Sequence, residues 1–287
     1  MDQLIKIMSI NQSELNSPDM NINNILNAAN YESLCDYSII PPEGKIFKDE
    51  ILTKNAIIFC KTDYIGYLFD NIKHSKYQYI LITHHSDYSI DENVFLHKPT
   101  CIKKWLAINA THKNPQLMRI PLGLKTHSGI YVEKVNDQPF YKIDWLVENS
   151  DRLKNKTKNN QIYCNWGNTN PSRNSIIDEL KKKNLPFVKE NGLGYLEYLE
   201  SMSDFKYVIS PPGNGLDCHR TWESLYLGCI PIVIKDSIYD DWADLPILQV
   251  NSYSDLNMEL LNKFSKQSFR YDILHIEYWK NIIKNFE

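Results

Sequence analysis

The segment from residue 206 to residue 236 constrains the fold of this chain more than any other. It reads KYVISPPGNGLDCHRTWESLYLGCIPIVIKD, so a short apolar run is followed by a proline and glycine loop, a helix-length stretch and a second apolar run. This order predicts a strand at 207–209, a helix that Gly228 ends, and a second strand at 230–234. Units of this kind build parallel sheets, whose ligands bind at the carboxyl ends of the strands.

The polar residues of this unit predict an anion site. If Asp217 is the helix N-cap, Arg220 is the third helical residue, where the helix dipole disfavours a cation by about 0.3 to 1 kcal/mol unless an anion is bound. The loop at 213–215 offers backbone N–H groups to a phosphate, and Glu223 is placed to accept hydrogen bonds from a ribose. Without a ligand, the same pattern is an Arg220–Glu223 surface pair flanked by turn and cap residues.

An earlier strand and loop repeat this arrangement. The run QIYCNW predicts a strand, the loop GNTN after it contains Asn168, and Pro171 begins a helix that Asn170 caps. Arg173 is then the third residue of its helix, as Arg220 is of the other. Two such arginines favour one shared anion, and a diphosphate requires more than one donor group.

The run SPPGNGLDCHRTWESLYLGCIPIV resembles the nucleotide-sugar-binding signature of exostosin-like glycosyltransferases, which are found in plants, animals, bacteria and large algal viruses. Weaker similarity covers KTD at 61–63, ITHHSD at 82–87, KKWLAINATHKNPQLMRIPLGL at 103–124 and NTNPSR at 168–173. The resemblance implies an α/β protein with a GT-B fold, in which two Rossmann-like domains face each other across a cleft. It also implies an inverting sugar transfer from a nucleotide diphosphate donor.

Inverting transfer requires a base for the proton of the acceptor hydroxyl, and the resemblance places it in the first domain. Asp87, which ends the THHSD loop, is the first candidate. Asp63 is the second, with a helix N-cap as its structural alternative. His84, His85 and His219 are left without a role. The candidate donor-binding residues are Asn168, Arg173, Gly213, Asn214, Gly215, Asp217, Arg220 and Glu223.

No metal or other cofactor is expected, because the nucleotide sugar is itself a substrate. No two aspartates stand two positions apart, so the D-x-D pair that holds a divalent metal in other nucleotide-sugar enzymes is missing. Neither the eight histidines nor the six cysteines show zinc-ligand spacing. The two arginines and the helix N-termini are expected to neutralise the diphosphate instead.

Two domains are expected. Residues 1–150 form the acceptor-side domain, with 1–30 as a peripheral lead-in, and 151–265 form the donor-binding domain. Residues 266–287 form a helix that returns to the first domain, and the polar run at 149–161 is the interdomain linker. The other expected elements are strands at 56–60, 79–82, 118–122, 161–166 and 185–188, and helices at 64–72, 101–109, 140–148 and 193–202.

Charge and hydropathy limit the partners. The net charge is −3, with 32 basic against 35 acidic residues, so neither nucleic acid nor anionic lipid is attracted. No apolar run approaches the roughly 20 residues that span a bilayer, and the N-terminal residues lack the apolar core of a signal peptide. Six dispersed cysteines suggest reduced thiols. We therefore expect a cytoplasmic protein, in the host cytoplasm if the source is viral, without a membrane span.

The sequence thus predicts a metal-independent inverting glycosyltransferase that moves a sugar from a UDP-sugar, with UDP-xylose as the first choice, to an oligosaccharide or glycan acceptor. One alternative is a sugar-nucleotide epimerase or hydrolase on the same fold, which needs no acceptor. Another is a non-catalytic module that binds nucleotide sugars or glycans. Product analysis with and without acceptor distinguishes these functions.

Overall fold

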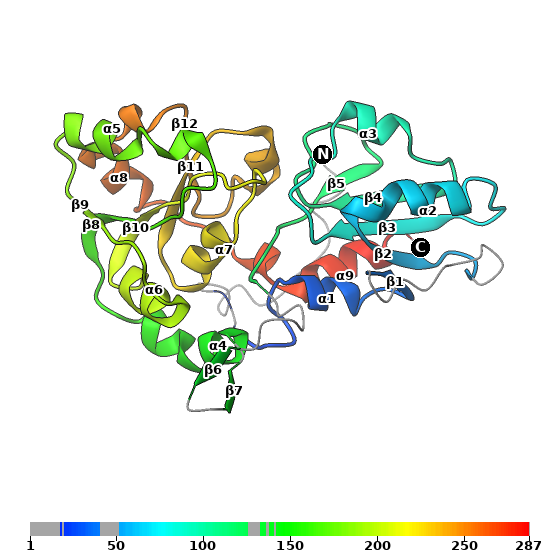
Figure 1. Ribbon diagram of the computed structural model, residues 1–287, viewed down its shortest axis with the longest axis horizontal. Coiled ribbons are helices and arrows are strands. Elements are labelled where there is room, and N and C mark those ends of the chain that lie inside the picture. The colour runs from blue at the N-terminus through cyan, green and yellow to red at the C-terminus, as the bar shows by residue number, and fades with distance from the viewer. Residues whose placement is uncertain are drawn as a thin grey trace.

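The computed structural model describes residues 18, 20–40, 52–125, 133–135, 138–140 and 142–286. These residues form a mixed α/β protein built on two parallel sheets of five strands each, one in either half of the molecule (Figure 1). The strand order is β1-β2-β3-β4-β5 in the first sheet and β12-β11-β10-β8-β9 in the second. A short antiparallel pair, β6 (Glu133–Val135) and β7 (Gln138–Phe140), precedes α4 (Lys142–Lys154).

The first sheet is buried on both faces. Its strands are β1 (Tyr37–Ile39), β2 (Ile57–Lys61), β3 (Tyr79–His84), β4 (Ile102–Ala107) and β5 (Leu117–Arg119). Alternate residues of β2 point to opposite faces, so Ile58 packs with α2 (Ile65–Ile72) and α3 (Glu92–Leu96). Phe59 packs on the other face with α1 (Ala28–Glu32) and α9 (Ile276–Lys284).

The helix predicted at 101–109 is wrong, because β4 occupies these residues. Trp105, Leu106 and Ala107 are all buried, with Trp105 and Leu106 on opposite faces of the sheet. The sequence of β4, IKKWLA, has two half-buried lysines followed by three residues buried on both faces, so it lacks the alternation of a half-exposed strand. Periodicity does not separate such a run from a buried helix of similar length.

The second sheet carries the strand, loop, helix, strand unit as predicted. Its strands are β8 (Asn159–Cys164), β9 (Phe187–Lys189), β10 (Phe205–Ile209), β11 (Ile230–Ile234) and β12 (Leu248–Val250). The helices of this half are α5 (Ile176–Lys182), α6 (Tyr195–Met202), α7 (His219–Tyr226) and α8 (Met258–Phe264). Short 3₁₀ turns occupy Thr62–Tyr64, Pro171–Arg173, Ser237–Trp242, Tyr253–Asp255 and Asp272–Leu274. Gly228, with φ of 67°, follows the end of α7.

The cap of α7 corrects one expectation. Cys218 is the N-cap, so Asp217 lies outside the helix and Arg220 is its second residue instead of its third. By contrast, Asn170 caps the turn Pro171–Arg173 as predicted, with its side chain accepting a hydrogen bond from the Ser172 N–H.

The polar run at 149–161 is not a linker. It contains the end of α4 and the start of β8, and the Arg152 guanidinium lies 2.7 Å from the Glu200 carboxylate on α6. Leu146 and Leu153 stand seven positions apart, so they share one buried face of α4 while charged residues cover the other. Within 149–154, only Ser150 and Leu153 are buried, which is too few to reveal the amphipathic pattern in a polar run.

Residues 25–28 belong to the core, so this part of the predicted lead-in is not peripheral. Ile25 and Leu26 are fully buried, and the Leu26 N–H donates to the Tyr226 hydroxyl of α7 at 2.8 Å. Positions 1–17 and 19 of the predicted lead-in lie outside the described residues. The expectation failed because the apolar residues of NINNILNAANY are separated by asparagines, which here turn and cap the chain around α1.

The two halves share part of their core. One cluster of buried side chains contains Phe59 and Ile80 of the first sheet together with Val208 and Val233 of the second. Helix α9 lies beside α1 under the first sheet (Figure 1), where the Trp279 ring meets the Tyr31 ring edge-on at 6.3 Å. In the described part of the chain, no helix combines the length and the apolarity needed to cross a bilayer.

Candidate functional site

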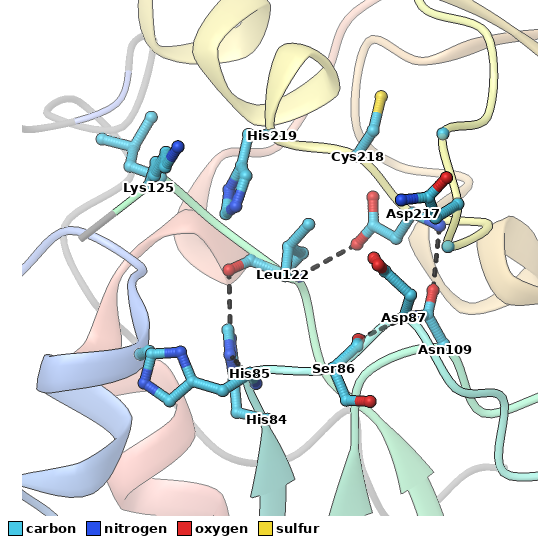
Figure 2. A pocket seen from close by; sticks show the side chains of 15 residues that line it. His84, His85, Ser86, Asp87, Asn109, Leu122, Lys125, Asp217, Cys218 and His219 are labelled. Carbon is cyan, nitrogen blue, oxygen red and sulfur yellow. Dashed lines mark hydrogen bonds between the residues drawn. The ribbon is translucent and has the colours of Figure 1, made fainter. Parts of the chain in front are cut away.

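A cavity of about 310 Å³ lies where the carboxyl ends of the two sheets face each other (Figure 2). The segments that follow β3, β4 and β5 form one wall, and the loop after β10 with the start of α7 forms the other. This size is at the lower end of the range for small-molecule sites. Since parallel sheets bind ligands at the carboxyl ends of their strands, this cavity is the candidate functional site.

Of the two predicted bases, Asp87 lines the cavity and Asp63 is not among its lining residues. Asp63 belongs to the 3₁₀ turn before α2, and its carboxylate lies 3.6 Å from the Lys61 ammonium group. The N-cap of α2 is Tyr64, and no side chain caps this helix, so the capping role expected for Asp63 is also wrong.

His84 is a structural residue at the edge of the cavity. Its Nδ1 accepts the His85 N–H at 2.8 Å, which assigns the ring hydrogen to Nε2, and Nε2 then donates to the Leu122 carbonyl at 3.1 Å. Burial lowers the pKa of His84 well below its usual value, so the ring is neutral at pH 7. Through this hydrogen bond, His84 connects the end of β3 to the segment after β5.

His85 adopts a left-handed backbone conformation, with φ of 60°. Its half-buried ring lines the cavity and meets the Phe59 ring edge-on at 5.9 Å. Burial lowers the pKa of His85, so this imidazole also stays neutral at pH 7. A non-glycine residue in this conformation is uncommon and marks a local constraint.

Glycine residues allow the opposite wall to approach Asp87. A Cβ atom added at Gly215 would lie 3.1 Å from Asn109 Nδ2 and 3.3 Å from Asp87 Oδ1. At Gly213, an added Cβ would lie 3.5 Å from Arg173 Nη2. Asn214, between them, is exposed and also lines the cavity. The predicted base and the predicted glycine loop therefore meet across the cavity.

Asp217 joins the two walls. Its carboxylate accepts hydrogen bonds from the Leu122 N–H and from Trp222 Nε1, both at 2.9 Å, and its own N–H donates to Asn109 Oδ1 at 2.9 Å. These donors favour the ionised carboxylate, but burial outweighs them and raises the pKa of Asp217 to about 7. Asp217, predicted to contact the donor, thus forms hydrogen bonds between the two halves.

His219 supplies an acceptor inside the cavity. Its Nδ1 lies 2.7 Å from the Gly123 carbonyl, and because a carbonyl only accepts, we assign the ring hydrogen to Nδ1. Burial lowers the pKa of His219, so the ring is neutral at pH 7 and Nε2 carries a lone pair. The ring extends from the start of α7 toward the opposite wall (Figure 2).

Arg173 holds the glycine loop from behind. It is buried, and it donates from Nε to the Pro212 carbonyl at 2.9 Å, from Nη1 to Gly167 at 2.7 Å and from Nη2 to Pro211 at 3.4 Å. This arrangement gives Arg173 a positioning role in place of the expected diphosphate contact. Asn168 is exposed and is not among the lining residues of the cavity.

Arg220 and Glu223 lie behind the same loop. The Glu223 carboxylate is buried and accepts from the Tyr195 and Tyr198 hydroxyls at 3.0 and 2.9 Å, so its oxygens already have partners other than a ribose. Arg220 Nε is buried without a hydrogen-bond partner in the described part of the chain. Burial and then the charge of Arg220 lower the pKa of Arg173, whereas Tyr198, Cys218 and the Glu223 carboxylate outweigh burial and raise the pKa of Arg220.

Three features of the site were not predicted from the sequence. Asn109 follows β4 and joins both walls, but the stretch around it was read as a helix. The Leu122 N–H donates a hydrogen bond to Asp217, and the Gly123 carbonyl accepts one from His219; no side-chain pattern reveals these backbone contacts with the second half. Lys125 adds a charged side chain to the lining. A polar residue directly after a buried strand was the available signal for Asn109.

Comparisons with known proteins add no assignment. No family model matches the chain, and no curated protein matches it. Among residues 18, 20–40, 52–125, 133–135, 138–140 and 142–286, no three histidine, cysteine or carboxylate side chains are grouped so as to hold a metal ion. The geometry of the cavity is therefore the basis for a proposed function.

Proposed function

We propose that this protein is a glycosyltransferase of the GT-B type, which moves a sugar with inversion from a nucleotide diphosphate donor to a glycan hydroxyl. One observation carries the proposal: a single cavity lies between the carboxyl ends of two parallel sheets and has Asp87 on one wall and the 213–215 loop on the other. Neither half encloses this cavity alone. Two substrates that meet between two domains require such an arrangement.

The second half supports the donor role through its positive potential. The N-terminus of α7 opens at the cavity, where the dipole favours a negative group. Behind it, Arg220 lies close enough to Arg173 to lower the pKa of Arg173, and Glu223 balances part of the charge of Arg220. A diphosphate would offset this charge, and the same groups would stabilise it as the leaving group.

The first half supplies the base. In the proposed reaction, Asp87 accepts the proton of an acceptor hydroxyl while the hydroxyl oxygen forms a bond to the anomeric carbon of the donor sugar. The bond from that carbon to the diphosphate breaks on the opposite side, and the nucleoside diphosphate leaves with the electron pair. The neutral rings of His85 and His219 add uncharged hydrogen-bonding groups for sugar hydroxyls.

The finer assignments belong to this proposal. We propose a UDP-sugar as donor, with UDP-xylose the first to be tried, and no metal requirement, since arginine and helix dipoles take the place of a D-x-D metal pair. All six cysteines are free thiols, which fits the reducing cytoplasm that we propose as its location, in the host if the source is viral.

The test begins with a panel of nucleotide diphosphate sugars in a thermal-shift assay, because a ligand at 100 times its dissociation constant stabilises a protein by about 2.7 kcal/mol. Donors that bind are then incubated with mixed glycan acceptors, with and without EDTA. Expected is an acceptor-dependent transfer that EDTA leaves intact.

Other outcomes separate the rival functions. Conversion of the donor without acceptor would identify an epimerase or hydrolase, and binding without turnover would identify a binding module. If no nucleotide sugar stabilises the protein, the donor site assigned to the second half is wrong.

A further inference from the structure

Asn109 occupies an unusual position in the cavity. It follows β4, lines the cavity and is only 4% exposed, and its backbone is left-handed with φ of 52°. Asparagine tolerates this conformation better than most residues, but burying a polar side chain there is costly unless its hydrogen bonds are satisfied. Such positions are retained where the surrounding structure requires them, often at functional sites.

The hydrogen bonds of Asn109 explain the position. Its Nδ2 donates to the Ser86 carbonyl at 3.3 Å, and its main-chain carbonyl accepts the Ile90 N–H at 3.1 Å. Asp87 lies between these two contacts, so its loop is held on both sides. On the other wall, Asn109 Oδ1 accepts the Asp217 N–H at 2.9 Å (Figure 2).

The side-chain amide can form hydrogen bonds to both walls, because it carries one acceptor and one donor group in a fixed plane. The acceptor meets an N–H of the second half, and the donor meets a carbonyl of the first. A carboxylate would supply only the acceptor, and a hydroxyl does not extend to both sides. The space between Asn109 and the glycine loop is also narrow, since a Cβ atom at Gly215 would lie 3.1 Å from Asn109 Nδ2.

We propose that Asn109 is a positioning residue that sets the Asp87 loop against the donor loop. This inference rests on the proposed function, because it assigns the distance between the base and the donor sugar to one side chain. Asn109 itself does not exchange a proton. A displacement of about 1 Å between reacting groups costs on the order of a hundredfold in rate, which gives this single amide a large effect on turnover.

The test uses two graded variants and a matched control. Asn109→Asp keeps the acceptor for the Asp217 N–H but replaces the donor to Ser86 with an oxygen that repels the carbonyl. Asn109→Gly keeps the left-handed backbone and removes both side-chain contacts. Asn184→Asp is the control, because Asn184 is also left-handed, with φ of 51°, but is exposed and outside the cavity lining.

Three quantities are measured for each folded variant: kcat, the dissociation constant of the donor, and hydrogen exchange of the Asp217 amide. We expect Asn109→Asp to lower kcat at least tenfold, change donor binding less than threefold and leave this amide protected. Asn109→Gly should lower kcat further and speed exchange of the amide at least tenfold. Because a carboxylate at 109 adds a negative charge beside Asp87, kcat is compared on the pH-independent plateau.

The outcomes separate this inference from the proposed function. Parental kcat in Asn109→Asp, with transfer intact in the parent, overturns the positioning role and leaves the glycosyltransferase proposal standing. If the parent transfers no sugar, the proposed function fails. Hydrogen exchange alone then tests whether Asn109 bridges the two walls through its hydrogen bond to the Asp217 N–H. Unchanged exchange of the Asp217 amide in Asn109→Gly overturns the bridge in either case.

Discussion

Arg220 and Arg173 are both basic residues behind the glycine loop, but they use their guanidinium groups differently. Arg173 donates to three backbone carbonyls, whereas Arg220 Nε is left without a partner among the described residues. We therefore expect Arg220→Ala to weaken UDP binding at least tenfold in titration calorimetry, with Arg220→Lys a poor rescue because lysine lacks the planar fork. Parental affinity in Arg220→Ala would contradict the donor site.

Arg173→Ala is the informative comparison for that experiment. It leaves three loop carbonyls without their donor, so its main effect should be a lower free energy of unfolding, by about 1 to 3 kcal/mol. Weaker UDP binding would then follow from a loosened loop, and a stabilising buffer should restore part of it. Arg220→Ala should show no such recovery.

Asp87 and Asp63 form a matched pair of carboxylates, one inside the cavity lining and one outside it. Asp87→Asn should cut transfer on the order of a hundredfold or more, because an amide does not take up the proton at neutral pH. Donor binding should change little, since Asp87 lies on the acceptor wall. Steady-state kinetics and donor titration measure the two effects separately.

Asp63→Asn is the control for that variant. Among the described residues, its carboxylate caps no helix and forms an ion pair with the part-exposed Lys61, so stability and turnover should both remain near parental values. If Asp63→Asn abolished transfer while Asp87→Asn did not, the base would have been assigned to the wrong residue.

Asp217 should make stability depend on pH. Burial raises its folded-state pKa from 3.8 to about 7, so the folded protein binds this proton more tightly than the unfolded chain does. The resulting stabilisation is fully present below pH 3.8 and is lost as pH rises to about 7. It amounts to a few kcal/mol, since one pKa unit corresponds to about 1.4 kcal/mol.

The measurement compares the parent with Asp217→Asn in denaturant titrations between pH 5 and pH 8. His84, His85 and His219 have lowered pKa values and act in the opposite direction, but they do so in both proteins. The difference in free energy of unfolding between the two proteins should therefore shrink as pH rises. A difference that is constant across this range would contradict the raised pKa of Asp217.

At the scale of the elements, local signals were sufficient for some predictions. The unit β10–α7–β11 was predicted because its turn residues and apolar runs are contiguous, and Gly228 adopts the expected left-handed conformation. Strand β4 was missed because its sequence, IKKWLA, joins two half-buried lysines to a short buried apolar run and so shows no strict alternation. The end of α4 was missed because Leu153 is the single apolar side chain that is buried between residues 149 and 154.

The site was predictable only in part, because many of its contacts join distant segments. The sequence placed Asp87 and the 213–215 loop at strand ends, and the topology of parallel sheets brings such ends together. The carboxylate of Asp217 meets Leu122, 95 positions away, so a cap within its own helix was the only partner visible in the sequence. Arg173 likewise meets backbone carbonyls of a loop 38 and 39 positions away.

The glycine loop after β10 gives a prediction at the same scale. Gly215→Ala would bring a Cβ within 3.1 Å of Asn109 Nδ2 and 3.3 Å of Asp87 Oδ1, so the Asn109 and Asp87 side chains must shift by a few tenths of an ångström. We expect at least a tenfold loss of kcat with little change in thermal stability. Gly167→Ala is the matched loop control, because apart from its chain neighbours no atom of the described residues lies within 4 Å of a Cβ at that position. Equal kcat values in the two variants would argue against close approach at Gly215.

At the scale of the whole molecule, the shared core predicts that the two halves unfold together. Trp279 of α9 is 3% exposed and belongs to the cluster that contains residues of both sheets. Trp279→Ala should lower the free energy of unfolding by about 3 to 5 kcal/mol, the usual cost of removing a large buried ring. Leu96→Ala, at a position that is 72% exposed, should have no measurable effect.

Calorimetry measures this cooperativity. A single transition that moves to lower temperature in Trp279→Ala is expected. Two separate transitions, of which only one moves, would show that the halves are energetically independent despite the shared cluster.

The pairing of α9 with α1 also means that the core around α1 is completed only at the end of synthesis. Asn24 and His275, whose side chains lie 3.0 Å apart, are separated by 251 positions, which a ribosome covers in roughly 10 to 50 seconds at about 5 to 20 residues per second. During that interval the buried faces of Ile25, Leu26 and Tyr31 lack the partners that arrive with Trp279. A nascent chain stopped before His275 therefore displays an open apolar face on its first sheet, which makes it a target for chaperones.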